Sequence, residues 1–258
     1  MSNRISPWFL VLLAATAAGG VLTVVGTPEA EATGSSVLLT AGVVVLVLAG
    51  WAVSLCLHEF GHAFTAYRAG DRSVQGKGYL NLDIRRYTDV GLSFVLPVVF
   101  LLLGGIPLPG GAVWIDHAAI RSRPMRAMVS LAGPLTNLVI GALLTIAVAL
   151  LPMPVGLAIG LSCLALIQVL AFVLNILPVP GLDGFGALEP FLPASTRQLA
   201  DRVRPWAPIV LFLVLIGLPG ASQLFFNVGG AIFAAAGGNL PMAATGYNEL
   251  FFWQGSLA

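Results

Sequence analysis

The sequence predicts an all-α polytopic membrane protein with about six transmembrane helices, a re-entrant or surface-lying element and a short β-hairpin. Two observations predict this fold class. Of the 258 residues, 58% are hydrophobic and 9% are charged, and the mean hydropathy is +0.95. Soluble domains carry about 25% charged residues, so this chain cannot form a water-facing surface. The apolar residues also lie in long runs, several of which approach the roughly 20 residues that a helix needs to cross a bilayer.

Each long apolar run is interpreted as a spanning helix, because a helix satisfies its backbone N–H and C=O groups within its own segment. Pro219 and Gly220 divide the last apolar stretch, and this pair is a turn signal. Two short helices in a tight hairpin are therefore expected there. The expected spans are Trp8 to Val25, Ser36 to Leu57, Val129 to Leu151 and Val155 to Leu177. The hairpin helices are Pro205 to Leu218 and Ala221 to Ala236, and their shorter length leaves open whether each of them crosses the membrane fully.

The first run has two interpretations. Arg4 gives it a positive start, and the small residues from Ala14 to Gly20 offer cleavage sites of the kind found in signal peptides. The apolar residues nevertheless continue to Val25, which favours an anchor that is retained.

The basic residues predict the orientation of the chain in the membrane. Residues 26–35, after the first run, contain Glu29 and Glu31 and no cation. By the positive-inside rule this loop lies outside, and the basic clusters lie in the cytoplasm. The clusters are Arg4; Arg68, Arg72, Lys77, Arg85 and Arg86; Arg121, Arg123 and Arg126; and Arg197, Arg202 and Arg204.

Residues 91–107 are apolar, but a full span there would put the second and third basic clusters on opposite sides of the membrane. The run contains Pro97, Gly104 and Gly105, which disfavour a regular helix. Non-helical backbone at that depth is tolerated where protein or a water-filled cavity satisfies it. We therefore expect a re-entrant or surface-lying element that returns to the cytoplasm.

The second run leads directly into His58-Glu59-Phe60-Gly61-His62. Positions i and i+4 share one face of a helix, so His58 and His62 can bind one ion with Glu59 beside them. Neutral imidazoles bind Zn²⁺, which makes water more acidic, and an adjacent carboxylate can take the proton. Two of the three histidines lie in this motif, and ionisable groups at membrane depth are functional by default. His117 is interpreted as a loop residue near the membrane surface.

A catalytic zinc needs a third protein ligand, and Asp183 is the best candidate. If residues 91–107 do not span, the chain leaves the cytoplasm in Val129 to Leu151 and returns in Val155 to Leu177. Asp183 then lies on the same side as the two histidines. Cys56 and Cys163 lie inside apolar runs, so they predict neither a disulfide nor a cysteine-rich metal site.

Three motifs occur in order along the chain: His58 to His62, Ala132 to Asn137, and Asn175-x-x-Pro178-x-Pro180-x-x-Asp183-Gly184. Together they resemble the site-2 protease family of intramembrane zinc metalloproteases, in its minimal form without a PDZ or nucleotide-binding domain. The resemblance covers residues 36–189. It implies that His58, His62 and Asp183 bind one Zn²⁺, that Glu59 is the general base, and that Asn175 and Pro178 help to hold an unwound substrate. Gly181-Leu182 departs from the family pattern, in which a second proline is often found.

The sequence leaves other roles open. Asn175 either bonds a substrate backbone or ends a helix. Asn137 either contacts substrate or, as we favour, forms a polar clamp between helices beside Gly133. Residues 75–84 alternate weakly, which fits an edge strand near the catalytic residues that adds a substrate strand, or a basic loop that attracts anionic lipid.

These features predict a single membrane-embedded metalloprotease domain over residues 1–258, with a catalytic core over 36–189 and a C-terminal helical hairpin over 205–236. Its partners are the lipid bilayer and a single-pass membrane protein, which it cleaves within or near the membrane span. We expect it in the plasma membrane with the active site towards the cytoplasm. A net charge of +1 disfavours nucleic acid.

Three alternatives remain. A catalytically silent zinc-binding scaffold would have no need of Glu59 as a base. A transporter would favour inverted repeats or a polar line across several spans, and neither is evident. A prenyl-protein endopeptidase would share the His-Glu-x-x-His motif but would not explain the segment from Asn175 to Gly184.

Overall fold

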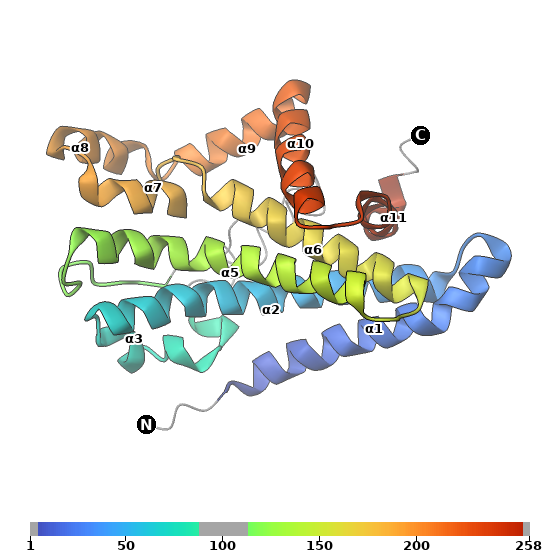
Figure 1. Cartoon of the computed structure of the whole chain (residues 1–258). Coiled ribbons are helices and arrows are strands. Elements are labelled where there is room, and N and C mark those ends of the chain that lie inside the picture. The colour runs from blue at the N-terminus through green and yellow to red at the C-terminus, as the bar shows by residue number, and fades with distance from the viewer. Residues whose placement is uncertain (1–4, 88–112, 255–258) are drawn as a thin grey trace. The chain divides into compact units, whose positions relative to one another are not determined.

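Four long helices dominate the computed structural model, which describes residues 5–87 and 113–254. They are α1 (Pro7–Thr33), α2 (Val37–Ala69), α5 (Arg123–Leu150) and α6 (Val155–Asn175), drawn in Figure 1. Each is long and apolar enough to cross a membrane. They confirm the four long runs that the sequence predicts as helices, and the described residues contain no strand.

Helix α2 is longer than the apolar run that predicts it. The run ends at Leu57, but the helix continues to Ala69. It stops at Gly70, whose φ of +129° requires a residue without a side chain. The amide of Gly70 still donates to the carbonyl of Ala66 at 3.0 Å. The two motif histidines therefore lie within a continuous helix.

The last apolar stretch forms two helices with a sharp bend between them. Helices α9 (Ala207–Gly217) and α10 (Pro219–Ala235) meet at an angle of 98°. Leu218 is extended, with φ −113° and ψ 104°, because a residue before proline is driven away from helical angles. Neither helix is long enough to count as a span by itself, but the two together could form one broken span. The described residues therefore contain four candidate spans, or up to five if this bent pair is one of them. The predicted number of six is not confirmed.

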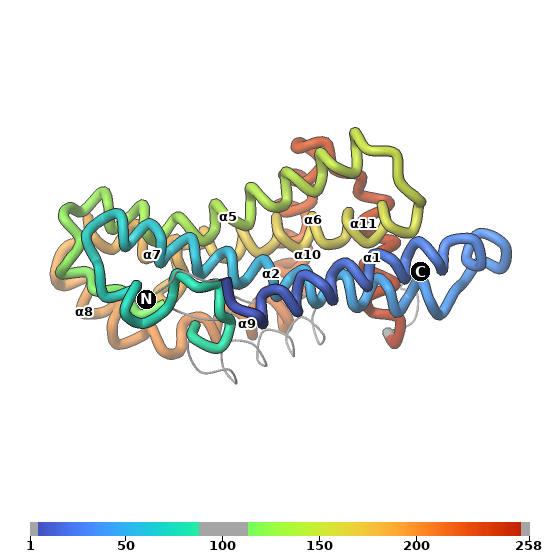
Figure 2. The backbone as a smooth tube through the Cα atoms, turned by 90° about the horizontal axis from the view of Figure 1, so that it is seen from below, coloured from blue at the N-terminus to red at the C-terminus, as the bar shows by residue number. Residues whose placement is uncertain are grey.

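The chain divides into two compact units, and α2, α5, α6 and α10 each contribute to both. The second unit comprises residues 7–54, 138–169 and 229–258. Within it, α1 and the first part of α2 pack backbone against backbone, and Figure 2 shows them side by side. A Cβ on Gly19 would lie 2.3 Å from the amide nitrogen of Leu46, and one on Gly42 2.5 Å from that of Thr23. Glycines at such positions let apolar helices approach closely.

The first unit comprises residues 1–6, 55–137 and 170–228 and contains the motif residues. Its smaller elements are α3 (Ser73–Gly76), η1 (Tyr79–Asn81), η2 (Ile84–Arg86), α7 (Asp183–Leu188), η4 (Glu189–Phe191), α8 (Ala194–Val203) and α9. The second unit also contains α11 (Leu240–Leu250), followed by η5 (Phe252–Gln254), neither of which the sequence predicts. Asn239 begins α11 by accepting a hydrogen bond from the amide of Met242 at 3.0 Å.

Residues 75–84 form helical turns, so the edge strand, one of the two interpretations of their alternation, is not observed. Gly78 and Leu82 adopt left-handed φ angles of 76° and 54°, which turn the chain at two points and prevent an extended run. Asp83 then caps the next turn by accepting from the amide of Arg85. The β-hairpin is therefore not confirmed, and residues 91–107, the expected re-entrant element, lie outside the described residues.

Candidate active site

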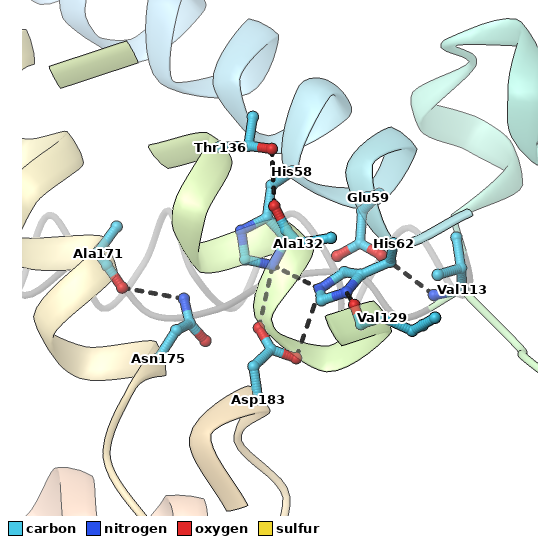
Figure 3. Close-up of polar contacts among 10 residues, drawn as sticks. All are labelled: His58, Glu59, His62, Val113, Val129, Ala132, Thr136, Ala171, Asn175 and Asp183. Atoms are coloured by element: carbon cyan, nitrogen blue, oxygen red, sulfur yellow. Dashed lines mark hydrogen bonds and ion pairs between the residues drawn. The ribbon is translucent and has the colours of Figure 1, made fainter. Parts of the chain in front are cut away.

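His58 and His62 lie one helical turn apart on α2, with their imidazoles turned to the same side (Figure 3). Both residues are buried, with exposed fractions of 4% and 5%. Their Nε2 atoms are 3.1 Å apart. The spacing of i and i+4 thus produces the convergence that the sequence predicts.

A backbone carbonyl on α5 fixes the orientation of the second imidazole. Nδ1 of His62 lies 2.7 Å from the carbonyl oxygen of Val129. A carbonyl can only accept, so Nδ1 carries the hydrogen and Nε2 of the neutral ring keeps its lone pair. Histidine ligands of metals are commonly held in this way.

Asp183 begins α7 and completes a group of three with the histidines. Its Oδ2 lies 3.2 Å from Nε2 of His58, and its Oδ1 lies 3.4 Å from Nε2 of His62. After α6 ends at Asn175, the chain reverses tightly. A Cβ on Gly184 would lie 2.1 Å from the carbonyl oxygen of Ile176, so the reversal needs glycine there.

Two glycines bring α5 against the metal-ligand side of α2. A Cβ on Gly133 would lie 2.2 Å from Nε2 of His62 and 2.4 Å from Nε2 of His58. A Cβ on Gly61 would lie 2.8 Å from the hydroxyl oxygen of Thr136. The sequence predicts Gly133 only as a helix contact, whereas the structure shows that its missing side chain leaves room at the imidazole nitrogens.

Glu59 lies beside the triad and is held by the chain opposite it. Only 3% of the residue is exposed, and its Oε2 accepts a hydrogen bond of 3.1 Å from the amide of Val113. The amide of Asp116 donates to Oδ2 of Asp71 at 2.8 Å. Lys77 donates to the carbonyl of Trp114 at 2.9 Å. Glu59 on α2, and Asp71 and Lys77 after this helix, thus hold residues 113–116 next to the Glu59 carboxylate.

The three side chains fit a zinc ion. In a tetrahedral site with bonds of about 2.0–2.1 Å, neighbouring ligand atoms lie about 3.3 Å apart. Here the two Nε2 atoms are 3.1 Å apart, and each imidazole has a different oxygen of Asp183 at 3.2 or 3.4 Å. With one ligand atom taken from each residue, the three atoms lie within 4.8 Å of one another. Acceptor atoms gathered this closely repel one another unless a cation lies among them. His58, His62 and Asp183 therefore form a group that could bind a metal ion.

Comparisons with known proteins agree with this geometry. The model of Peptidase family M50 matches residues 43–161. Rip2 of Mycobacterium tuberculosis (strain ATCC 25618 / H37Rv) is 46% identical over 98% of this chain and 95% of its own length. This chain belongs to peptidase family M50. Rip2 of Mycolicibacterium smegmatis is 41% identical over 98% of this chain and 95% of its own length. YwhC of Bacillus subtilis is 28% identical over 67% of this chain and 81% of its own length.

The names of these relatives describe zinc metalloproteases. As a family member, the M50 protein is a zinc metalloprotease with zinc as its cofactor, and its apolar helices are those of a multi-pass membrane protein. This confirms the resemblance to the site-2 protease family. No solved structure matches the chain significantly.

A cavity of about 250 Å³ adjoins the metal group of this M50 protease. Glu59, Asn175 and Arg204 line it together with the triad. His117 also lines the cavity, but it is not a member of the metal group and is exposed. Partial desolvation of its ring lowers the pKa of His117, and the nearby charge of Glu189 opposes this shift without cancelling it. His117 is therefore a loop residue at the cavity and not one of the metal group.

The structure separates the expected substrate-binding residues. Asn175 is buried and lines the cavity, and its Nδ2 donates to the carbonyl of Ala171 at 3.0 Å. Pro178 is exposed in the loop after α6, and Asn137 is buried on α5. Neither of these two is among the described residues that line the cavity. Substrate contact by all three stays a prediction.

Sequence reasoning missed Val113, Val129 and Arg204. The first two act through backbone atoms, so their side chains carry no signal of the contact. Arg204 is assigned from sequence only to a basic cluster, although it lines the cavity of the metal group. In the sequence, Arg204 lies in a polar link after several apolar runs, and nothing in this position predicts that it lies close to Asp183.

Proposed function

We propose that this M50 protease cleaves a single-pass membrane protein within or near its membrane span. The observation that carries the proposal is the position of the metal group and Glu59 on α2, directly after the apolar run of that helix. The run from Ser36 to Leu57 is long enough to cross the hydrocarbon of a bilayer, so His58 follows at one end of it. A peptide bond that reaches this site must come from a chain at the membrane.

We assign His58, His62 and Asp183 as the zinc ligands. A bound zinc ion makes water more acidic and polarises the carbonyl of the scissile bond. Val129 keeps the imidazole of His62 in the tautomer that presents Nε2. Two histidines and one carboxylate form a three-ligand set that leaves one position open, as catalytic zinc sites require.

Glu59 acts as the general base and then as the general acid. Its carboxylate takes a proton from the attacking water and later gives it to the nitrogen of the leaving amine. The amide of Val113 holds Oε2, which restricts the carboxylate to one orientation in the cavity. A buried, oriented carboxylate beside the metal group supports an active enzyme over a catalytically silent zinc-binding scaffold.

The substrate must be unwound at the point of cleavage, because a helical carbonyl is already hydrogen-bonded within its helix. Asn175 lies in the cavity beside the metal group and is suited to hold the unwound backbone, with Pro178 in the adjoining loop. Asn137 lies elsewhere on α5, and a polar clamp between helices remains the favoured role for it.

The basic clusters support an orientation in the plasma membrane with the active site towards the cytoplasm. Residues 58–87 and 113–126 contain two of these clusters together with the zinc motif. We also propose that residues 1–258 work as one membrane-embedded protease domain. Their catalytic core would cover 36–189, and the C-terminal hairpin 205–236.

The proposal is tested by comparing membrane proteomes of cells that carry the wild-type protein or Glu59→Gln. The variant keeps the zinc ligands but lacks the base, so uncleaved substrates should accumulate. We expect at least one single-pass protein to accumulate and its shortened product to disappear. Unchanged levels of every single-pass protein and its fragments would contradict an intramembrane substrate.

A further inference from the structure

Two residues that line the cavity beside the metal group each have a buried polar atom without a hydrogen-bond partner among the described residues. These atoms are Oδ1 of Asn175 and Nε of Arg204. Both residues line the same cavity as the metal group. Buried polar atoms are nearly always paired in proteins, so this pair indicates a ligand that supplies a donor and an acceptor.

Asn175 offers the acceptor. It lies at the last position of α6, and only 2% of it is exposed. Its Nδ2 is engaged with the carbonyl of Ala171, a bond that Figure 3 shows. The amide oxygen therefore remains for a ligand that donates an N–H.

Arg204 offers the donor. Its Nη2 donates to Oε1 of Glu189 and lies 3.2 Å from Oδ1 of Asp201. These two carboxylates fix the guanidinium and offset its charge. Nε–H is therefore suited to a neutral acceptor such as a carbonyl rather than to an anion.

The loop that leads to Asp183 packs against the backbone of Arg204. Gly181 has a φ of +100°, and a Cβ there would lie 3.2 Å from the carbonyl oxygen of Arg204 and 2.8 Å from the ring of Pro208. The arginine is thus held next to the same loop that positions the third zinc ligand.

We propose that Arg204 is a positioning residue that donates Nε–H to a backbone carbonyl of the substrate, while Oδ1 of Asn175 accepts from a substrate N–H. An unwound peptide presents both groups, whereas a helix has its own N–H and C=O groups paired. The two residues therefore select the unwound segment at the cavity. This inference rests on the proposed proteolytic function and adds a residue that the sequence motifs do not contain.

Two hydroxamate probes separate recognition of the metal from recognition of the backbone. Acetohydroxamate can reach the metal but has no peptide backbone, whereas an N-acetyl-dipeptidyl hydroxamate has both. Binding of each probe to the zinc-loaded full chain in detergent is measured by calorimetry. Arg204→Gln should weaken the dipeptidyl probe about tenfold or more, because it removes a donor from a charged group. Acetohydroxamate should bind unchanged.

Arg202→Gln is the matched control. It removes the same charge two residues earlier, within α8, which ends just before Arg204, but Arg202 lines a different cavity with Trp206 and Val210. We expect it to bind both probes within about twofold of the wild-type protein, since that difference is below the contribution of one hydrogen bond.

Arg204→Lys distinguishes backbone recognition from a purely structural ion pair. Lysine keeps a positive charge for Glu189 but has no donor at the position of Nε. It should lose affinity for the dipeptidyl probe as glutamine does, and it decides the question if Arg204→Gln fails to fold.

Three results would overturn the assignment of Arg204. They are full dipeptidyl affinity in Arg204→Lys, full dipeptidyl affinity in a folded Arg204→Gln, and equal weakening of both probes, which would locate the effect at the metal. A zinc-loaded wild-type protein that binds neither probe would instead count against the proposed function itself.

Discussion

His62 shows how one backbone contact controls the chemistry of a side chain. The sequence places His62 four residues after His58 on one helix face, and the structure confirms that their Nε2 atoms converge. The proton on the opposite nitrogen is set by the carbonyl of Val129, which is distant in sequence. Spacing therefore predicts which side chains meet, but the tautomer depends on a neighbour that only folding supplies.

Loss of one proposed zinc ligand should separate metal binding from catalysis. Asp183→Ala removes the carboxylate that faces both imidazoles, so purified protein should lose most of its zinc. Glu59→Gln removes the proposed base and should retain zinc while losing cleavage. Metal content is measured by elemental mass spectrometry, with Glu31→Ala, an exposed residue on α1, as control. Full zinc content in Asp183→Ala would exclude this residue as a ligand.

Of the segments that surround the site, one has a position that the sequence predicts and another does not. The prolines and glycines after α6 predict a break, and the structure shows that this break returns Asp183 to α2. The link at residues 113–116 has no such signature. It is held by Asp71, which follows α2 and accepts from the amides of Ser73 and Asp116 at 2.9 and 2.8 Å.

Asp71→Ala should release this link from the end of α2. Burial raises the pKa of Asp71, but hydrogen bonds from Ser73 and Asp116 outweigh it and leave the pKa below its ordinary value. Its contribution is thus complete at neutral pH and is lost as the pH falls through that lowered pKa. We expect faster amide hydrogen exchange over residues 113–122 in the variant at neutral pH, measured by mass spectrometry.

The control for this exchange experiment is Asp201→Ala, which removes a carboxylate whose side chain is 64% exposed. Its exchange over residues 113–122 should match that of the wild-type protein. Equal protection of this segment in Asp71→Ala and wild type would show that other contacts hold it.

Two expectations about elements differ from the structure for local reasons. The weak alternation at residues 75–84 suggested a strand, yet left-handed Gly78 and Leu82 produce turns. Pro219-Gly220 correctly predicts a break, but the resulting helices of 11 and 17 residues are too short to count as separate spans by themselves. The residue types indicate where a helix or strand is interrupted, whereas the backbone angles determine whether a segment forms a turn, a strand or a helix.

For the whole molecule, zinc binding should couple to stability, because the three proposed ligands come from α2 and from α7. An ion that binds only the folded chain stabilises it by about 4 kcal/mol at roughly a thousandfold excess over its Kd. Removing zinc with a chelator should therefore lower the Tm of wild type and of Glu59→Gln, and zinc should restore it. The Tm of Asp183→Ala should hardly respond, and an equal fall in this variant would show that the chelator acts elsewhere.

Composition and local motifs were enough to predict the membrane class, the long apolar helices and the family, and to propose His58, Glu59, His62 and Asp183 as the site residues. These follow from composition, from runs of about 20 apolar residues and from fixed spacing, all of which are local properties of the chain. The contacts of the folded chain add that Val129 orients His62, that Val113 holds Glu59, and that Arg204 and Asn175 line one cavity. These contacts join backbone and side-chain atoms that are distant in sequence, and folding alone brings them within hydrogen-bonding distance or around one cavity.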